Sequence, residues 1–280
     1  MKNITENAIE IVGKEAGLTS VILAGVHGDE YGGIEAIKEI VSNISIQKGK
    51  VFFIFGNPLA IQNNVRFVEA NLNRMFADKL VAEKDKQSYE YKRAQFLKGY
   101  LDQADALLDI HSSFTPKSKP FIITEANTKD ITKFLPFDLV VTGFDAVEPG
   151  GTDYYMNTIR GSKGICVECG HLADENSANV AKESVYAFLK VMGHIEPNDF
   201  VERTNQSFIH IDNLYHTKTN KFILAKGFED FEKISAGQIL AKDGEESVIA
   251  EKDGIILFAR NRERVNDEGF LSGEYTKTLI

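Results

Sequence analysis

Two histidines and a glutamate in the first half of the chain have the types and positions of metal ligands. The apolar run 21–24 is followed closely by His27 and, three residues later, by Glu30. A second apolar run, 106–110, ends in His111. Open α/β sheets bind ligands beyond the carboxyl ends of their strands, so we expect these three side chains to meet there. Three protein ligands with an open fourth position are typical of a catalytic zinc site.

A glutamate within a later apolar run is the candidate general base. Residues 164–168 have the pattern of a buried strand, and a carboxylate such as Glu168 is costly there unless it has partners or a function. Beside a metal it could activate water for hydrolysis. Asp109 lies on the same strand face as His111 and could fix the tautomer of that histidine. Taken alone, any one of these histidines is more often a hydrogen-bonded core residue.

Arginines and asparagines after the second predicted strand could bind carboxylates or polarised carbonyls. Arg66, Asn73 and Arg74 all lie in this segment. Arg74 could equally form a structural ion pair, and Arg66 could be solvated. Arg160 could supply another carboxylate contact or be a surface charge, because its spacing does not fix its direction.

The two cysteines form a Cys-x-x-Cys pattern around the candidate base. Residues i and i+3 of a strand point to opposite faces and lie ~10 Å apart, which is too far for a disulfide. Cys166 and Cys169 are therefore expected to be buried free thiols. His171 is left out of the metal site, because three ligands and an open position suffice.

Composition narrows the class of protein. The 280 residues are 43% hydrophobic and 26% charged, with a formal net charge of −9, which disfavours nucleic acid or an anionic membrane as the main partner. No apolar run reaches the ~18 residues of a membrane span, and the first residues lack the apolar stretch of a secretory signal. Two cysteines make no disulfide framework, so we expect a cytoplasmic protein.

The order of elements predicts an α/β fold with a mostly parallel mixed sheet flanked by helices. Strands are expected at 20–26, 50–55, 106–110, 121–124, 139–142 and 164–168, and helices at 33–43, 86–103 and 176–192. Short β-type runs separated by glycine turns follow, at 208–214, 222–224, 238–240, 247–250 and 254–258. We therefore expect a hydrolase domain over 1–196 and a smaller all-β domain over 197–280.

Taken together, the candidate residues resemble one family. The pattern resembles that of the succinylglutamate desuccinylase/aspartoacylase family, within the zinc carboxypeptidase-like superfamily. The resemblance covers most of residues 20–170, and the β-rich tail is similar to the family's second domain. The residues that carry it are His27-x-x-Glu30, Asn57-Pro58, Arg66, Asn71-Leu72-Asn73-Arg74, His111 and Glu168.

The resemblance implies a role for each residue of the catalytic centre. One zinc ion per chain would be bound by His27, Glu30 and His111. Glu168 would be the general base and later the proton donor. Arg66 would polarise the scissile carbonyl and steady the oxyanion.

The resemblance also implies how substrate is bound. Asn73 and Arg74 would hold the free carboxylate of the substrate, and Arg160 would be a second arginine for the same purpose. Tyr215 or Tyr275 could reach the active site from the β domain, which would narrow the cleft and restrict it to small substrates.

The function implied is zinc-dependent hydrolysis of the amide bond in small, anionic N-acyl amino acids or related carboxylates. A zinc carboxypeptidase acting on short peptides is the alternative within the superfamily. A metal-dependent binding or regulatory protein that has lost catalysis is a third hypothesis. The acyl group, the amino acid, the physiological metal and the oligomeric state, a homo-oligomer included, are left open.

Overall fold

The computed structural model of the chain describes residues 2–5, 7–196 and 201–280. The main element among these residues is a mixed sheet of twelve strands in the order β1-β2-β4-β3-β5-β8-β6-β7-β9-β15-β14-β11. A smaller antiparallel sheet has the order β10-β12-β13. The strands are β1 Lys2–Thr5, β2 Ala8–Val12, β3 Glu15–Ala24, β4 Lys48–Phe55, β5 Ala106–Ser113, β6 Phe121–Thr124, β7 Leu139–Thr142, β8 Lys163–His171, β9 Ser207–His216, β10 Phe222–Leu224, β11 Glu232–Ile234, β12 Ile239–Asp243, β13 Glu246–Ile249, β14 Gly254–Leu257 and β15 Glu268–Thr276.

The centre of the large sheet is parallel. Strand β3 pairs in parallel with β4 on one side and with β5 on the other, and β5 pairs in parallel with β8. Strand β6 then runs antiparallel to β8. The carboxyl ends of the four parallel strands therefore meet at one edge, and the predicted mixed α/β fold is confirmed.

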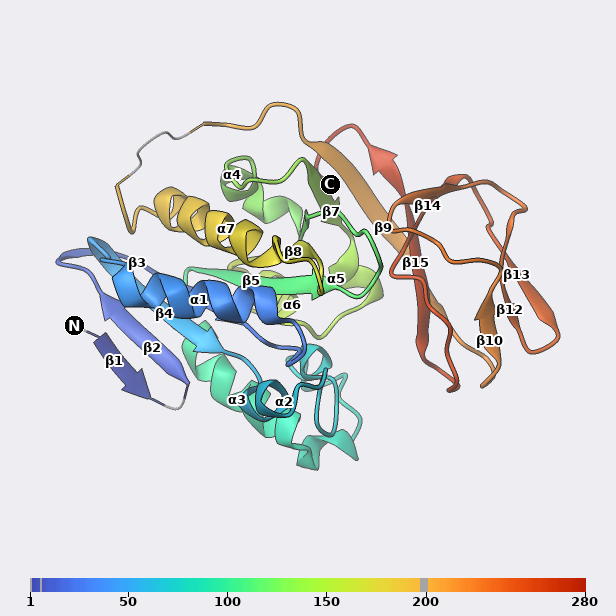
Figure 1. Cartoon of the computed structure of the whole chain (residues 1–280), viewed down its shortest axis with the longest axis horizontal. Coiled ribbons are helices and arrows are strands. Elements are labelled where there is room, and N and C mark those ends of the chain that lie inside the picture. Colours follow the sequence, from blue (N-terminus) through green and yellow to red (C-terminus); the bar gives the residue numbers. More distant parts are fainter. Residues whose placement is uncertain (1, 6, 197–200) are drawn as a thin grey trace.

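Helices cover both faces of this centre (Figure 1). Helices α1 (Tyr31–Asn43) and α7 (Ser177–Val191) lie side by side on one face, and α3 (Tyr89–Leu101) covers the other. Alternate residues of β3 explain why both faces need cover: Ile22 packs with the first core and Val21 with the second. Shorter helical segments are α2 Pro58–Asn63, α4 Lys129–Thr132, α5 Phe144–Val147, α6 Thr152–Tyr154, η1 Leu72–Arg74, η2 Asp85–Gln87, η3 Ala126–Thr128 and η4 Tyr155–Ile159.

Helix α3 differs from the prediction in where it starts and in what it buries. It begins at Tyr89 rather than at residue 86, because the Ser88 side chain accepts a hydrogen bond from the amide of Tyr91 and caps the helix. Its inner face includes Glu90 and Arg93 among apolar residues. Arg93 donates hydrogen bonds to the carbonyls of Phe55 and Gly56, and Glu90 accepts hydrogen bonds from backbone amides of the loop described below.

The C-terminal third is built from strands, as expected, but it is joined to the main sheet. Strand β9 pairs in parallel with β7 and antiparallel with β15, so the ladder continues from one part of the chain into the other. The expected boundary between 196 and 197 falls next to residues 197–200, which lie outside the described part. The division into 1–196 and 197–280 stays a prediction.

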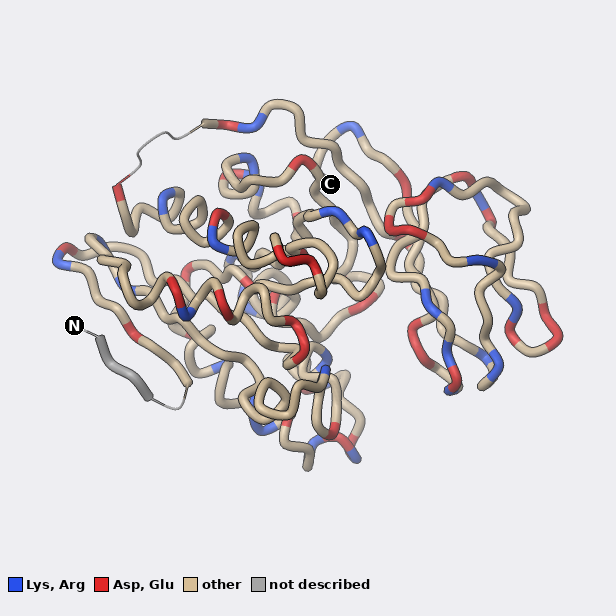
Figure 2. The backbone as a smooth tube through the Cα atoms, in the orientation of Figure 1, with Lys and Arg blue, Asp and Glu red and all other residues tan. Residues whose placement is uncertain are grey.

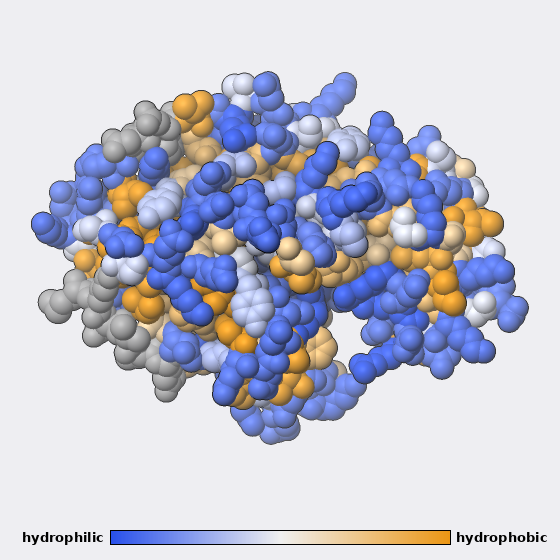
Figure 3. Space-filling view, viewed as in Figure 1, coloured by the Kyte–Doolittle hydropathy of each residue, from blue (hydrophilic) through white to orange (hydrophobic). Residues whose placement is uncertain are grey.

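The surface is mixed in character. Acidic and basic residues are interspersed along the chain rather than gathered on one face (Figure 2). In the space-filling view the molecule is hollowed where the C-terminal strands meet the helical body (Figure 3). Of the helices in the described ranges, none is both long and apolar enough to span a membrane.

Candidate active site

The turn after β3 places the first two candidate ligands at the carboxyl edge of the sheet. Gly25 takes a φ of 70°, which lets the chain turn sharply at the end of the strand. A Cβ on Gly28 would lie 2.1 Å from the carbonyl carbon of Ala60, so only glycine fits against α2 there. His27 is thereby held on one side of this turn, and Glu30 sits immediately before α1.

The three predicted ligands come together in the structure. Ligand atoms of His27, Glu30 and His111 all lie within 4.8 Å of one another, and all three residues are buried. The Nδ1 atom of His27 is 2.7 Å from Glu30 Oε1, and Nδ1 of His111 is 3.0 Å from Glu30 Oε2. Two imidazole nitrogens thus face the two oxygens of one carboxylate, as in a potential metal centre.

The second nitrogen of each imidazole has an oxygen beside it. His111 Nε2 lies 3.2 Å from Asp109 Oδ2, and His27 Nε2 lies 3.0 Å from Asn71 Oδ1. Asp109 also accepts a hydrogen bond from Thr152. With a metal on Nδ1, an oxygen of this kind would favour the tautomer that keeps its proton on Nε2. The proton that Nδ1 shares with Glu30 would then be released. The donor set and its outer contacts therefore fit a zinc ion, and Asp109 lies where the sequence placed it.

Electrostatics keep this cluster suited to a cation. Although burial opposes ionisation of Glu30, the two imidazoles hold its pKa well below the usual value. Burial, helped by the charge of Arg66, lowers the pKa of His27 to about 4, so this imidazole is neutral at pH 7. For His111 the effect of burial is overcome, and Asp109 and Glu30 raise its pKa well above the usual value. An ionised carboxylate between two histidines is a favourable environment for a divalent cation.

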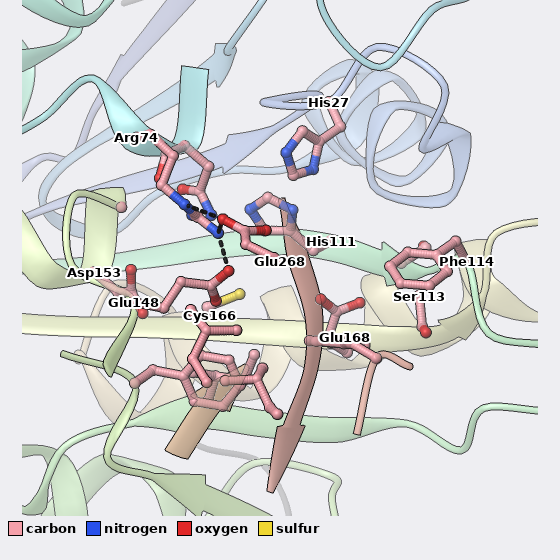
Figure 4. Close-up of a pocket in the computed structure, with 18 of the residues that line it drawn as sticks. His27, Arg74, His111, Ser113, Phe114, Glu148, Asp153, Cys166, Glu168 and Glu268 are labelled. Atoms are coloured by element: carbon pink, nitrogen blue, oxygen red, sulfur yellow. Dashed lines mark hydrogen bonds and ion pairs between the residues drawn. The ribbon is translucent and has the colours of Figure 1, made fainter. Parts of the chain in front are cut away.

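Glu168 stands beside this cluster. In the parallel pairing of β5 with β8, His111 is the direct neighbour of Glu168, and both line the same pocket (Figure 4). Its Oε2 atom is buried and makes no hydrogen bond within the described residues. Burial and the nearby charge of Glu30 raise the pKa of Glu168 to about 8. A carboxyl group that titrates near neutrality beside a metal site is suited to transferring protons.

Arg66 reaches the same cluster from the loop after α2. Its Nη1 donates a 3.1 Å hydrogen bond to Glu30 Oε1. Buried Glu90 of α3 fixes this loop, because its carboxylate accepts hydrogen bonds from the amides of Val68, Glu69 and Ala70. Nothing in the pattern of residues 86–103 distinguishes Glu90, because that pattern predicts only a helix.

Arg74 lies in the pocket, but its guanidinium is already bound. It forms ion pairs with Glu148 and with Glu268, which reaches it from the start of β15, and Nη1 donates to the carbonyl of Asn73 (Figure 4). Asn73 also lines the pocket, and its Oδ1 atom is buried without a partner in the described residues. Arg74 thus forms ion pairs within the protein, which was the alternative to substrate binding. The Oδ1 atom of Asn73 is free to accept a hydrogen bond from a ligand.

The pKa values of the two carboxyl groups on Arg74 are shifted in opposite directions, which predicts unequal effects of mutation. Burial raises the pKa of Glu148 well above its usual value, while Arg74, overcoming burial, lowers the pKa of Glu268. Glu148→Gln should therefore change the free energy of unfolding by less than about 1 kcal/mol at pH 7.5. Glu268→Gln should cost about 1–2 kcal/mol, less than for a fully buried pair, because its side chain is 34% exposed.

Urea denaturation of both variants measures this difference. The lowered pKa means that Glu268 contributes stability above its unfolded pKa of about 4.5 and loses it as the pH falls. The gap between wild type and Glu268→Gln should therefore narrow below pH 4.5. Equal costs for the two variants at pH 7.5 would contradict this assignment of charge.

Arg160 is not brought to the pocket, which corrects the expectation for it. Its Nη1 donates to the carbonyl of Leu101, and Asp102 lies 3.8 Å away. Arg160 precedes the first residue of β8, whereas Glu168 lies near the far end of that strand. Five residues of strand span roughly 16 Å, so Arg160 lies at the opposite edge of the sheet and does not line the pocket.

Neither candidate tyrosine of the C-terminal part lines the pocket, which is a second correction. The hydroxyl of Tyr215 donates to Asp243, and its ring packs against the rings of both Phe222 and Phe270. Tyr275 is 53% exposed on the last strand. A tyrosine that does line the pocket is Tyr154 of α6, which the sequence did not indicate.

Other predictions hold. Cys166 and Cys169 are buried free thiols, and they belong to different cores on the two faces of the sheet. His171, at the end of β8, accepts a hydrogen bond from the amide of Ala173 and is not part of the metal group.

The space of the pocket, measured together with the part that is open to solvent, is about 840 Å³. Its walls come from both parts of the chain. The C-terminal part contributes residues that sequence reasoning missed, because only tertiary folding brings them to the site; these are Leu214, Phe258, Arg260, Arg262, Glu268, Phe270 and Leu271.

Glu125 binds the backbone at the start of α5, next to the pocket-lining residues Phe144 and Asp145, and its pKa lies near neutrality. Glu125 accepts hydrogen bonds from the amides of Gly143 and Asp145, just where α5 begins. Burial and then the charge of Asp145 raise the pKa of Glu125 to about 7. A raised carboxyl pKa means that stability is present at low pH and is lost as the pH rises through 7.

Glu125→Gln should therefore raise the melting temperature relative to wild type at pH 8 and give a much smaller gain at pH 5. The glutamine carbonyl can accept the same two amides. Thermal denaturation at both pH values, with exposed Glu183→Gln as control, measures the effect. A gain of the same size at pH 5 would show that the carboxyl charge is not responsible.

Parallel strands ending in a His/Glu/His cluster, with a buried carboxylate beside it, define the class of the protein as a candidate metallohydrolase. Residues 16–192 match the model of the succinylglutamate desuccinylase/aspartoacylase catalytic domain. The chain belongs to this family, as its motifs indicated, and members of the family are deacylases.

Individual relatives agree with this assignment. The chain is 26% identical over 262 residues to a succinylglutamate desuccinylase of Shewanella baltica, which covers 85% of this chain and 76% of that protein. The fold is shared with a succinylglutamate desuccinylase from Vibrio cholerae (TM-score 0.80, 19% identity, 95% of this chain and 85% of that one). It is also shared with the ectoine utilization protein EutE from Ruegeria pomeroyi (TM-score 0.71, 18% identity, 96% and 88%).

Proposed function

We propose that this protein is a zinc-dependent hydrolase that cleaves the amide bond of small N-acyl amino acids or related carboxylates. The observation that carries the proposal is the pairing of His111, a ligand of the candidate metal group, with Glu168 across β5 and β8. Held by His27, Glu30 and His111, zinc would supply a Lewis acid that lowers the pKa of water and polarises the carbonyl.

The residues of the chain would divide the remaining work. Glu168 takes a proton from the attacking water and later gives it to the departing amine nitrogen. Arg66, which already reaches Glu30, stabilises negative charge as it develops on the carbonyl oxygen. Asn73 has an unpartnered oxygen in the pocket and can accept a hydrogen bond from substrate.

The shape of the pocket favours small substrates over peptides. Residues of the C-terminal part, among them Phe258 and Phe270, line the pocket together with the metal group. Such a wall limits the length of chain that can lie across the site. This limit on substrate length supports the deacylase proposal over carboxypeptidase activity.

A substrate panel tests the proposal. Zinc-loaded protein is assayed against acetyl, succinyl and other short N-acyl amino acids, and against dipeptides and tripeptides with free C-termini, with apo protein as control. We expect zinc-dependent hydrolysis of at least one N-acyl amino acid and much weaker cleavage of peptides. Preferential cleavage of peptides would instead establish a carboxypeptidase, and zinc binding without any turnover would favour a binding protein.

A further inference from the structure

Arg260 is an arginine of the pocket whose guanidinium has no anionic partner. It lines the same pocket as the metal group, and its guanidinium carbon lies 4.0 Å from the ring centroid of Phe114. Its Nε atom is buried and makes no hydrogen bond within the described residues. No described carboxylate forms an ion pair with it within 4.0 Å. Asp29 is nevertheless close enough for the charge of Arg260 to act to lower the pKa of its carboxyl group.

Each of the other arginines of the pocket has a side-chain hydrogen bond within the described residues, and two of them are paired with carboxylates. Arg66 is bound to Glu30, and Arg74 is bound to two glutamates. The Nε atom of Arg262 donates to the carbonyl of Glu268. Arg160 lies at the opposite edge of the sheet, so neither Arg74 nor Arg160 presents an unpaired guanidinium to the pocket.

The surroundings of Arg260 are unfavourable for an isolated cation. Burial, together with the charges of Arg262 and Arg66, lowers the pKa of Arg260 to about 10. An unpaired charge in a partly buried position costs free energy, which a bound anion would recover. The guanidinium of Arg260 packs against the ring of Phe114, which restricts its orientation. The backbone amide of Arg260 donates a hydrogen bond to the carbonyl of Gly269, in strand β15.

We propose that Arg260 binds the free carboxylate of the substrate. The planar guanidinium matches a carboxylate with two parallel hydrogen bonds, and its stacking on Phe114 orients it in advance. Phe114 follows directly after β5, the strand that contains His111. The ring that packs against Arg260 and one ligand of the candidate metal group therefore belong to the same segment of the chain. The C-terminal part would thereby set specificity as well as narrow the cleft. The assignment of the ligand as substrate rests on the proposed deacylase function.

Steady-state kinetics of Arg260→Gln and Arg260→Lys in the zinc-loaded protein test this role. The substrates are an N-acyl amino acid and the matching N-acyl amine without the carboxylate. For Arg260→Gln, KM for the amino acid should rise by about 10- to 100-fold, the range expected when charge-assisted hydrogen bonds are lost. Turnover of the N-acyl amine should stay within about twofold, and Arg260→Lys should recover only part of the loss.

Arg264→Gln is the matched control, because Arg264 is an exposed arginine of the same segment. It should leave both substrates unaffected. An unchanged KM in Arg260→Gln, or an equal loss for both substrates, would overturn the proposal, the latter because it would indicate a structural role.

A binding measurement separates this inference from the proposed function. Calorimetry compares succinate with its neutral analogue succinamide on the wild type and on each variant. Wild type and Arg264→Gln should prefer succinate, and Arg260→Gln should lose at least about tenfold of that preference. If no acyl substrate is hydrolysed, the deacylase proposal fails while this comparison still decides the role of Arg260. A preference retained in Arg260→Gln would overturn the anion site itself.

Discussion

Glu168→Gln is expected to lower kcat by about 10²- to 10⁴-fold while leaving zinc content and fold unchanged. The glutamine has nearly the same shape, but it can neither accept a proton from water nor deliver one to the leaving amine. Because Glu168 makes no ion pair among the described residues and Oε2 has no partner, its replacement breaks no structural contact there. The measurement is turnover of the best N-acyl amino acid, alongside zinc content and circular dichroism.

Glu175→Gln serves as its control, because Glu175 is an exposed glutamate just beyond the same strand. It should retain full activity. If Glu168→Gln also turned over substrate at the wild-type rate, Glu168 could not be the general base, and the proton transfers would have to be assigned elsewhere.

Replacing a direct metal ligand is expected to have the second large effect. His27→Gln should reduce zinc well below one ion per chain after dialysis, and activity should fall by more than about a hundredfold. Losing only an outer partner of a ligand already costs about 10- to 100-fold. The variant should still fold, because His111 and Arg66 keep Glu30 paired.

Zinc analysis and hydrolysis assays on the same preparations measure this effect. His216→Gln, at an exposed histidine of β9, is the control and should keep both zinc and activity. Full zinc content and activity in His27→Gln would exclude His27 as a ligand.

The parallel core and the three ligands could be predicted because local patterns determine them. A buried strand reads as an apolar run, and its carboxyl end faces the ligand edge of the sheet. His27, His111 and Glu168 each stand at or near such an end. The positions of the strands were therefore sufficient to predict that these three residues lie close together.

The substrate side of the pocket could not be predicted in the same way. Arg74 was placed at the correct edge, but its partners Glu148 and Glu268 are 74 and 194 residues away. Arg260 enters the pocket from beyond β14, in a region whose turns carry no signal of chemistry. Since tertiary folding alone decides which charges meet, the sequence could not show that Arg74 is occupied and Arg260 is not.

Arg160 shows the limit of spacing as a guide. It precedes Glu168 by eight residues. The last part of that separation is extended strand, so Arg160 lies at the opposite edge of the sheet from Glu168. The resemblance implied a substrate contact, but the observed strand, Lys163–His171, leaves Arg160 beside the carbonyl of Leu101. A role carried over from a family must therefore agree with strand direction.

The most direct test of zinc-dependent deacylation is a zinc titration of the apo protein, followed by hydrolysis of an N-acyl amino acid. We expect no hydrolysis without metal. The rate should rise linearly with added zinc and reach its plateau at one zinc per chain, the stoichiometry of a single His27/Glu30/His111 site. Undiminished activity in the apo protein, or a fully zinc-loaded protein that hydrolyses no N-acyl amino acid, would contradict this expectation.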